Sequence, residues 1–292
     1  MAKESVGGVS FTNDRAQLAV LEVGGREIKV LHLEDLKKAS DRETWFLEAA
    51  VEMRDKGFKV AGKVKKISVA LDNTSVFLHS FPLDRTMTAA EQIEHLDWEL
   101  ANYIDNYNTT DYVRDWHILG GDGSESVSNI LAACVNRPMI NSLSTDLSAR
   151  GLELHVVDTN HFCALYALIT NYPEVRDKNV VLATVDQDRI DAGRIANGWL
   201  VSYQYTLGSR IEEAADFIEG FSNRPEITDV FLYGLGPTSE LFAKLKRSSR
   251  KSITILDPLR RLTLASSVTG VKSLASQANR FATAIGCALR KE

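Results

Sequence analysis

The sequence predicts an α/β protein made of two halves that share one order of elements. Strand groups and helices alternate along all 292 residues, which is typical of α/β folds. Each half opens with three extended runs, at residues 7–12, 15–23 and 26–33 and again at 180–185, 189–196 and 199–207. In each half a tight turn, Gly24-Gly25 or Asn197-Gly198, joins the second and third runs. Residue identities do not repeat, so the duplication is one of structural pattern.

The first half continues with a helix and two further strands. We expect the helix from Asp41 to about Gly57, because Trp45, Phe46 and small apolar residues share one face. Strands are expected at residues 66–71 and 76–81. Proline cannot donate a hydrogen bond to a strand ladder, so Pro82 is expected to end the second strand.

The most legible helix of the chain comes next. Thr88 and Glu91 have the spacing of a capping box, in which each side chain satisfies a backbone N–H of the other. An apolar stripe at helical spacing follows, formed by Ile93, Leu96, Leu100, Tyr103 and Ile104. These signals predict a helix from Thr88 to about Ile104.

The remainder of the first half alternates again. Strands are expected at 112–119, 129–135 and 152–157, with helices at 138–150 and from Thr159 or Asn160 to 169. Gly151 is a good residue to end the first of these helices. Residues 172–178, with Pro173 and several charges, are the best candidate for a linker between the halves.

The second half repeats the strand meander and then shortens. We expect a helix at 209–221, a strand at 229–233, a glycine turn with a second helix, and a strand at 252–256. A closing helix rich in small residues is expected at 276–290. Trp199, directly after the Asn-Gly turn, is expected to be half-buried on the sheet.

Composition excludes several classes of protein. The formal charge of −5 is not the basic balance of a nucleic-acid binder. The three cysteines lie apart among apolar neighbours, as expected of buried thiols in a reducing compartment. Neither a signal peptide nor a membrane-spanning stretch is visible. We therefore expect a cytoplasmic protein that does not insert into a membrane and does not bind nucleic acid.

Three strings, in this order, carry a family resemblance. They are "FPLDRTMTAAEQIEHLDWELANYI" (81–104), "NILAACVNRPMINSLSTDLSARGLELHVVD" (129–158) and "ANRFATAIGCALR" (278–290). The first two look like an inserted subdomain and its return to the main sheet, and the third looks like a closing helix. Together they resemble the actin-like superfamily, and within it most closely the PilM family of type IV pilus assembly proteins.

The resemblance implies an actin-like (ribonuclease H-like) fold of two lobes. The first lobe would span residues 1–176, with an inserted strand–helix subdomain at about 72–151, and the second lobe would span 177–292. The second lobe is reduced. Between Gly208 and Thr228 there is room for one helix, where the family carries a subdomain that covers one side of the nucleotide.

The same alignment shows that the nucleotide motifs are degenerate. In the family, two Asp-Ile-Gly-type turns hold the phosphates and Mg²⁺. Here Ser10 and Thr184 replace the two aspartates, and Thr12 and Asp186 replace the two glycines, while Gln17 replaces a lysine. Only the adenosine-side glycines, Gly234 and Gly236, remain. We expect no nucleotide cofactor and no enzymatic activity.

The family therefore implies a scaffold or adaptor. Its members bind the cytoplasmic tail of a PilN-like bitopic inner-membrane protein, often in a groove between the main lobe and the inserted subdomain. Such a protein associates with the inner membrane through its partner. We expect Gln92, His95 and Trp98 to lie near a partner surface. A homodimer is a further assembly that the sequence leaves undecided.

Two other functions stay open. One is a residual ATP-binding switch, or ATPase, built on Gly234 and Gly236 with altered phosphate contacts. The other is a metal-dependent hydrolase. Its candidate ligands are Asp186, Asp188 and Asp191, or the set His155, Asp158 and His161. Exposed turns and helix N-termini explain these polar residues without a metal. Cys163, close to His161, is expected in the core and not as a nucleophile.

Overall fold

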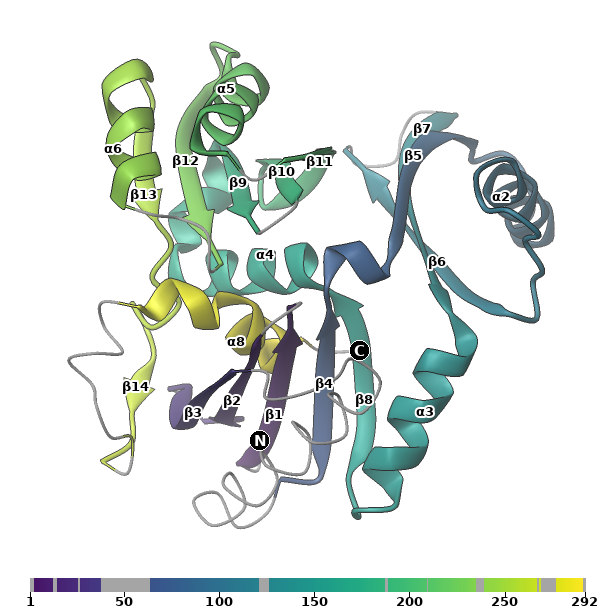
Figure 1. Cartoon of the computed structure of the whole chain (residues 1–292), viewed down its shortest axis with the longest axis horizontal. Helices are drawn as coiled ribbons and strands as arrows, with labels where there is room; N and C mark the ends of the chain where they lie inside the picture. The colour runs from purple at the N-terminus through teal and green to yellow at the C-terminus, as the bar shows by residue number, and fades with distance from the viewer. Residues whose placement is uncertain are drawn as a thin grey trace.

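Figure 1 shows the computed structural model, in which three β-sheets organise the chain. The structure describes residues 3–12, 15–25, 27–37, 64–120, 126–186, 189–208, 210–234, 239–266, 268 and 277–290. The helix expected from Asp41 to Gly57 lies outside the described residues.

The first sheet has the strand order β14-β3-β2-β1-β4-β8. Its strands are β1 (Glu4–Phe11), β2 (Arg15–Val23), β3 (Lys29–Lys37), β4 (Lys66–Leu71), β8 (Glu153–Thr159) and β14 (Thr263–Leu264). β1 is antiparallel to β2 and parallel to β4, so the meander runs into a parallel crossover. β14, from late in the chain, pairs with β3 and returns the chain to this sheet.

The predicted end of the third strand at residue 33 is wrong. β3 pairs with β2 as far as Lys37, through the acidic residues Glu34 and Asp35. Asp35 stays in the strand because Arg15 donates to its Oδ2 over 2.8 Å and Gln17 donates to its Oδ1 over 3.1 Å. A cross-strand ion pair thus outweighs the low strand propensity of aspartate.

The second sheet has the strand order β11-β10-β9-β12-β13. Its strands are β9 (Asn179–Val185), β10 (Arg189–Ala196), β11 (Trp199–Leu207), β12 (Ile227–Tyr233) and β13 (Ser252–Ile255). Helices α5 (Ile211–Ser222) and α6 (Ser239–Ser248) pack beside one another on this sheet. Buried residues of both helices, including Ile218 and Leu241, share a core with β9, β10 and β12.

The third, small sheet has the order β5-β7-β6 and is the predicted insertion. Its strands are β5 (Phe77–Asp84), β6 (Tyr112–Leu119) and β7 (Val127–Asn136), and a short 3-10 turn, η1 (Asn73–Ser75), leads into it. Helix α2 (Ala89–Tyr103) lies across one face, with the predicted Thr88–Glu91 capping box in place. Leu96 and Leu100 of α2 are buried against the sheet.

The prediction that Pro82 ends its strand is wrong. β5 continues to Asp84, with Pro82 opposite Asn129 of β7. β5 is the edge strand of the small sheet, where one side of the ladder has no partner strand within the described residues. An edge position tolerates the missing N–H of proline.

Helices α3 (Arg137–Ser148) and α4 (Asn160–Asn171) flank β8, and Thr159 caps α4 as predicted. The segment expected to be a linker instead forms the 3-10 helix η2 (Pro173–Asp177) and packs against the core. Tyr172 and Val175 are buried, and the Tyr172 hydroxyl accepts the N–H of Asp257 over 3.2 Å. The buried side chains of Tyr172 and Val175, more than the charged residues of this segment, therefore fix its position in the fold.

The closing helix is split into the 3-10 turn η3 (Ala278–Phe281) and α8 (Ala282–Leu289). α8 lies between α4 and the first sheet, close to both (Figure 1). A side chain at Gly286 would meet the Cys163 carbonyl oxygen of α4 at 1.7 Å, and one at Gly8 of β1 would meet the Ala284 carbonyl at 2.1 Å. Gly286 therefore lets α8 pack closely against the backbone of α4, and Gly8 lets the backbone of β1 pack closely against α8.

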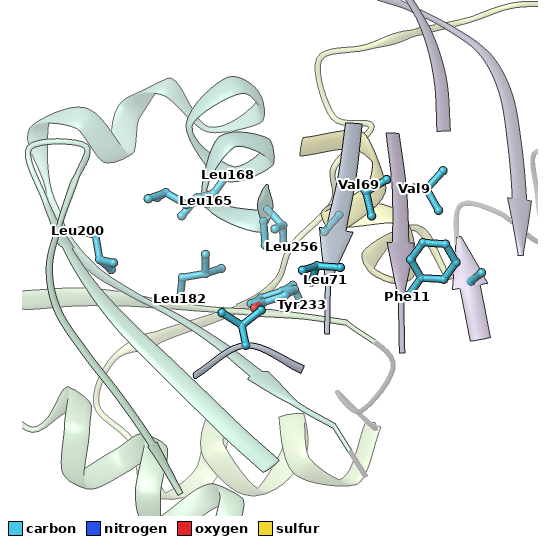
Figure 2. Close-up of a cluster of buried hydrophobic side chains, with 14 of the residues drawn as sticks. Val9, Phe11, Val69, Leu71, Leu165, Leu168, Leu182, Leu200, Tyr233 and Leu256 are labelled. Carbon is cyan, nitrogen blue, oxygen red and sulfur yellow. The ribbon is translucent and has the colours of Figure 1, made fainter. Parts of the chain in front are cut away.

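The largest core cluster joins the sheets through α4. Figure 2 shows Val9 and Phe11 of β1 and Val69 and Leu71 of β4 in one cluster with side chains of α4 and the second sheet. The remaining labelled members are Leu165, Leu168, Leu182, Leu200, Tyr233 and Leu256. α4 is thus the central element against which the two large sheets are fixed.

Within the part of the chain that the structure describes, none of the helices has the length and apolar character needed to span a bilayer.

Candidate binding groove and the predicted nucleotide turns

At the first predicted phosphate turn, the side chains form hydrogen bonds with one another and with neighbouring strands. Ser10 and Gln17 are buried, and the Ser10 hydroxyl donates to Gln17 Oε1 over 3.0 Å. Gln17 donates in turn to Asp35, which also accepts from Arg15. The Thr12 hydroxyl donates to the Arg15 carbonyl over 3.3 Å. The polar groups of this turn therefore satisfy one another.

The second turn brings three of the predicted positions together. Gly234 adopts a φ of +91°, and a side chain there would meet Thr184 Oγ1 at 2.6 Å and lie 3.8 Å from Asp186 Oδ1. Asn279 holds the same glycine from the other side, because its side chain donates to the Gly234 carbonyl over 2.7 Å. Thr184 is buried, so a hydroxyl and a carboxylate crowd this glycine. Gly236 lies outside the described residues.

A buried ion pair lies just beyond the second turn. Arg189 donates to Asp191 over 2.8 Å, to the Asn73 carbonyl over 2.9 Å and to the Tyr203 hydroxyl over 3.0 Å. Tyr203 also donates to Asp191, and Arg189 stacks on the Tyr205 ring. Burial lowers the pKa of Arg189, but its interactions with Tyr203 and Asp191 outweigh burial, so the pKa is raised.

This cluster connects two sheets. Asn73 belongs to η1, which links the first sheet to the small sheet, while Arg189, Asp191 and Tyr203 belong to the second sheet. The sequence offers Asp191 as a candidate metal ligand. Arg189 instead balances its charge, and Asp188 lies outside the described residues.

The candidate zinc residues do not converge. His161 is fully buried on α4, with its Nδ1 3.1 Å from the Tyr233 hydroxyl, and burial lowers its pKa to about 3. Asp158 pairs with Arg290 over 2.9 Å, and His155 lies on β8. Among the described residues, no three His, Cys, Asp or Glu side chains form a group that could hold a metal ion.

Cys163 has the environment of a core residue. It lies next to Cys287, and burial raises the pKa of its thiol well above the ordinary value. A thiol so protected from ionisation is a poor nucleophile. The sequence prediction of a core role agrees with this placement.

An open groove lies on the face of the small sheet opposite α2, between that sheet and α4. Its volume is about 700 Å³, within the range of roughly 300–1,000 Å³ typical of ligand pockets. The small sheet supplies one wall, α4 supplies another, and the tip of the β10–β11 hairpin closes one end. Residues lining it include Val113, Asp115, His117, Leu131, Ala133, Val135, Phe162, Leu165, Tyr166, Ile169, Asn197, Gly198 and Trp199.

The alternation of β6 and β7 explains the apolar wall. Side chains of a strand point alternately to its two faces. Trp116 and Ile130 pack on the α2 side. Leu131, Ala133 and Val135 point the other way, toward the core that includes α4. α2 covers only one face of the small sheet, so the groove is the second face left partly uncovered.

A few polar groups interrupt this apolar lining. Arg290 pairs with Asp158 and stacks on the Tyr166 ring, at 4.6 Å from its centroid. Burial raises the pKa of the Asp158 carboxyl, while Arg290 opposes that rise. His117 contacts Phe162 edge-on, and burial lowers its pKa with help from the Arg290 charge. The groove therefore has an apolar body and a small charged end.

Trp199 is exposed, so the expectation of half-burial is wrong. Its exposed fraction is 66 %, whereas Leu200, the next residue, is fully buried. β11 is the edge strand of the second sheet, and Leu200 takes the inward position. Alternation then turns the Trp199 indole outward, beside the groove.

The predicted partner residues Gln92, His95 and Trp98 form a different surface. They lie on α2, and none of them lines the groove. Trp98 is 62 % exposed and stacks with His95 at a ring distance of 6.0 Å, while Gln92 donates to the Met87 carbonyl. Sequence reasoning missed the groove residues. One signal in the sequence could have indicated the groove. The strands at 112–119 and 129–135 have apolar residues on both faces, but only one neighbouring helix was predicted to cover them.

Comparison with protein-family models and with curated protein sequences returns no match. Among solved structures, a chain of the "PilM-PilN type IV pilus biogenesis complex" is similar over 98 % of both chains, with a TM-score of 0.79 and 16 % identity. A Bacteroides thetaiotaomicron protein with an actin-like ATPase fold covers 86 % of this chain and 90 % of its own, with a TM-score of 0.54 and 11 % identity.

A third similar structure is the cytoplasmic domain of EpsL, an inner-membrane component of the type II secretion system of Vibrio cholerae. It covers 80 % of this chain and 84 % of its own, at a TM-score of 0.52 and 14 % identity. The prediction of fold class is confirmed, and the similarity extends over 98 % of the chain. The protein therefore has the actin-like ATPase fold, in a form similar to that found in the PilM–PilN complex.

Proposed function

We propose that this protein is a non-catalytic scaffold of a type IV pilus or related secretion machine. In this proposal it binds the cytoplasmic tail of a PilN-like, bitopic inner-membrane protein in the groove, and it associates with the membrane through that partner. The observation that carries the proposal is the groove itself. An apolar sheet face next to α4, with few polar groups, suits a short peptide segment better than a polyphosphate.

The state of the two turns supports a non-catalytic role. Ser10 and Gln17 already bond to one another and to Asp35. At the second turn Asp186 stands beside Gly234. A carboxylate about 4 Å from a phosphate charge costs roughly 1–4 kcal/mol for effective dielectrics between 80 and 20. The turns therefore lack the glycine cradle and the carboxylate pattern that Mg²⁺-nucleotide requires.

The solved structures support the choice of machine and partner. One was determined with PilN in a pilus biogenesis complex, and another is the cytoplasmic part of an inner-membrane secretion component. The first belongs to a type IV pilus biogenesis complex, and the second belongs to an inner-membrane component of a type II secretion system. Similarity of fold gives the proposal its direction, and binding by this chain is the property to test.

A groove-filling substitution tests the proposal. Ala133 lines the groove from β7 and is partly buried, so Ala133→Trp places an indole where the tail would lie. We expect it to abolish binding of a synthetic PilN-like cytoplasmic tail from the same organism, measured by calorimetry. Ala101→Trp adds the same side chain at an exposed position of α2 and is the matched control. Equal affinities of both variants and the wild type would refute groove binding.

A further inference from the structure

The groove has one wall element that comes from the second sheet. Asn197, Gly198 and Trp199, at the tip of the β10–β11 hairpin, line it together with residues of the small sheet and α4. In Figure 1, β11 lies on the side of the second sheet that faces the small sheet. A ligand in the groove would therefore meet both lobes.

The backbone that carries Trp199 is fixed. Asn197 and Gly198 have φ values of +52° and +79°, the left-handed conformations that a type I′ hairpin turn needs. Directly after Trp199, the Leu200 carbonyl accepts the Gly120 N–H over 3.2 Å, which ties the hairpin to the end of β6. Leu200 itself is fully buried. The position is thus rigid although its side chain is exposed.

The hairpin tip also packs against Arg176 of η2. A side chain at Gly198 would lie 3.4 Å from Arg176 Cγ, so the aliphatic part of Arg176 on η2 packs closely against the turn. η2 continues directly from α4, the opposite wall of the groove. The tip therefore keeps its place relative to α4.

An exposed indole on a rigid backbone has the properties of a binding anchor. Tryptophan is enriched among the residues that dominate binding energy, because it offers a large apolar surface with few rotatable bonds. Little ordering entropy is lost when the backbone is already fixed. Trp199 lies at the rim of an apolar cavity and is 66 % exposed.

From this geometry we infer that Trp199 packs against the bound tail as an aromatic anchor supplied by the second lobe. The inference rests on the proposed function, since it names a specificity-determining residue of the same groove. It adds that the tail contacts both lobes at once. The segment facing Trp199 is expected to be apolar, because the indole presents a mainly apolar surface.

The test compares two exposed tryptophans. Trp199→Ala is expected to weaken tail binding by about tenfold to thirtyfold, the usual loss at an aromatic hot spot. Trp98→Ala removes an indole of similar exposure, 62 %, from the α2 surface that the sequence predicts as a partner surface. If the anchor lies in the groove, Trp98→Ala leaves affinity unchanged, and a loss of affinity at Trp98 but not at Trp199 would refute the anchor. Both variants should melt like the wild type, because each loses a mainly solvent-exposed side chain.

A second readout follows the indole directly. In a Trp45→Phe/Trp98→Phe/Trp116→Phe background, Trp199 is the one remaining indole of the four in the sequence, and the bound tail is expected to protect its fluorescence from acrylamide quenching. Unchanged quenching in the presence of bound tail would refute the contact. If Trp199→Ala binds normally while Ala133→Trp does not bind, the anchor is refuted and the proposed function stands. If neither substitution changes affinity, the proposed function fails and the anchor with it.

Discussion

The two candidate ligand sites, the predicted nucleotide turns and the groove, differ in how far their side chains are already in contact with other protein groups. At the turns between the lobes, buried polar side chains such as Ser10, Gln17 and the Arg189–Asp191 pair are hydrogen-bonded to protein groups, although Thr184 Oγ1 has no hydrogen-bond partner among the described residues. At the groove, an apolar sheet face and a 66 % exposed indole meet a cavity of about 700 Å³. The first region is closed by the protein itself, and the second is open.

This difference teaches where an actin-like scaffold can change its ligand. In the proposed function, side chains other than glycine and aspartate at the turns form structural contacts in place of a phosphate cradle. Removing contacts from one face of an inserted sheet creates a site of another chemistry. Substitutions can therefore show whether the closed region acts as structure and the open region as a binding site.

The largest expected effect comes from breaking the buried ion pair. Asp191→Ala leaves the Arg189 guanidinium buried without a carboxylate, with the Asn73 carbonyl, the Tyr203 hydroxyl and the Tyr205 ring as its remaining partners. Loss of one partner of a buried pair typically costs about 3–5 kcal/mol. We expect a decrease of that size in the free energy of unfolding, measured by urea denaturation.

An exposed pair provides the control. Glu22→Ala removes the partner of Lys3, whose side chain is 68 % exposed, and should change stability by less than about 1 kcal/mol. The double variant Arg189→Met/Asp191→Leu should recover much of the loss, because no buried charge remains unpaired. A loss below about 1 kcal/mol in Asp191→Ala would contradict a structural role for the cluster.

A smaller effect is expected from pH, through His161. This side chain belongs to the closed region, where it lies against Tyr233 and Tyr203. Its folded pKa is about 3, below the ordinary 6.5, so it contributes stability above pH 6.5 that is lost as pH falls toward 3. At pH 5.5 the expected loss is about 1.4 kcal/mol relative to pH 7.5.

The variant His161→Phe should remove this part of the pH dependence. The quantity to compare is the difference in unfolding free energy between pH 7.5 and 5.5, because the substitution also changes packing at both pH values. The wild type should lose about 1.4 kcal/mol more than the variant over this interval. Parallel profiles for the two proteins would mean that His161 is not held neutral in the fold.

Local signals predicted much of this fold. The runs at 15–23, 66–71, 112–119, 189–196 and 199–207 have the bounds that the sequence predicts. The Thr88–Glu91 capping box is local chemistry and is confirmed in full. Pro82 was misjudged because its tolerance depends on which strand lies at the edge of a sheet, and that is a tertiary property.

The candidate sites were harder to predict for the same reason. Arg189 donates to a carbonyl 116 residues away, so no local pattern indicates their contact. The groove exists because one face of the small sheet is not covered by a helix, which only the assembled fold reveals. Family resemblance predicted degenerate turns and implied a groove between the lobe and the insertion. It did not identify Trp199 as part of its lining.

The last prediction compares nucleotide binding at the turns with tail binding in the groove. We expect millimolar Mg·ATP to leave the melting temperature unchanged, because Ser10 and Gln17 of the first turn are already hydrogen-bonded and Asp186 of the second turn repels phosphate. The tail peptide, at 100 times its dissociation constant, should add about 2.7 kcal/mol to stability and raise the melting temperature by several degrees. A shift with Mg·ATP of similar size would show that the closed region still binds nucleotide. The remaining glycine turn at Gly234 would then be the base of a working switch, and the protein would no longer be understood as a scaffold alone.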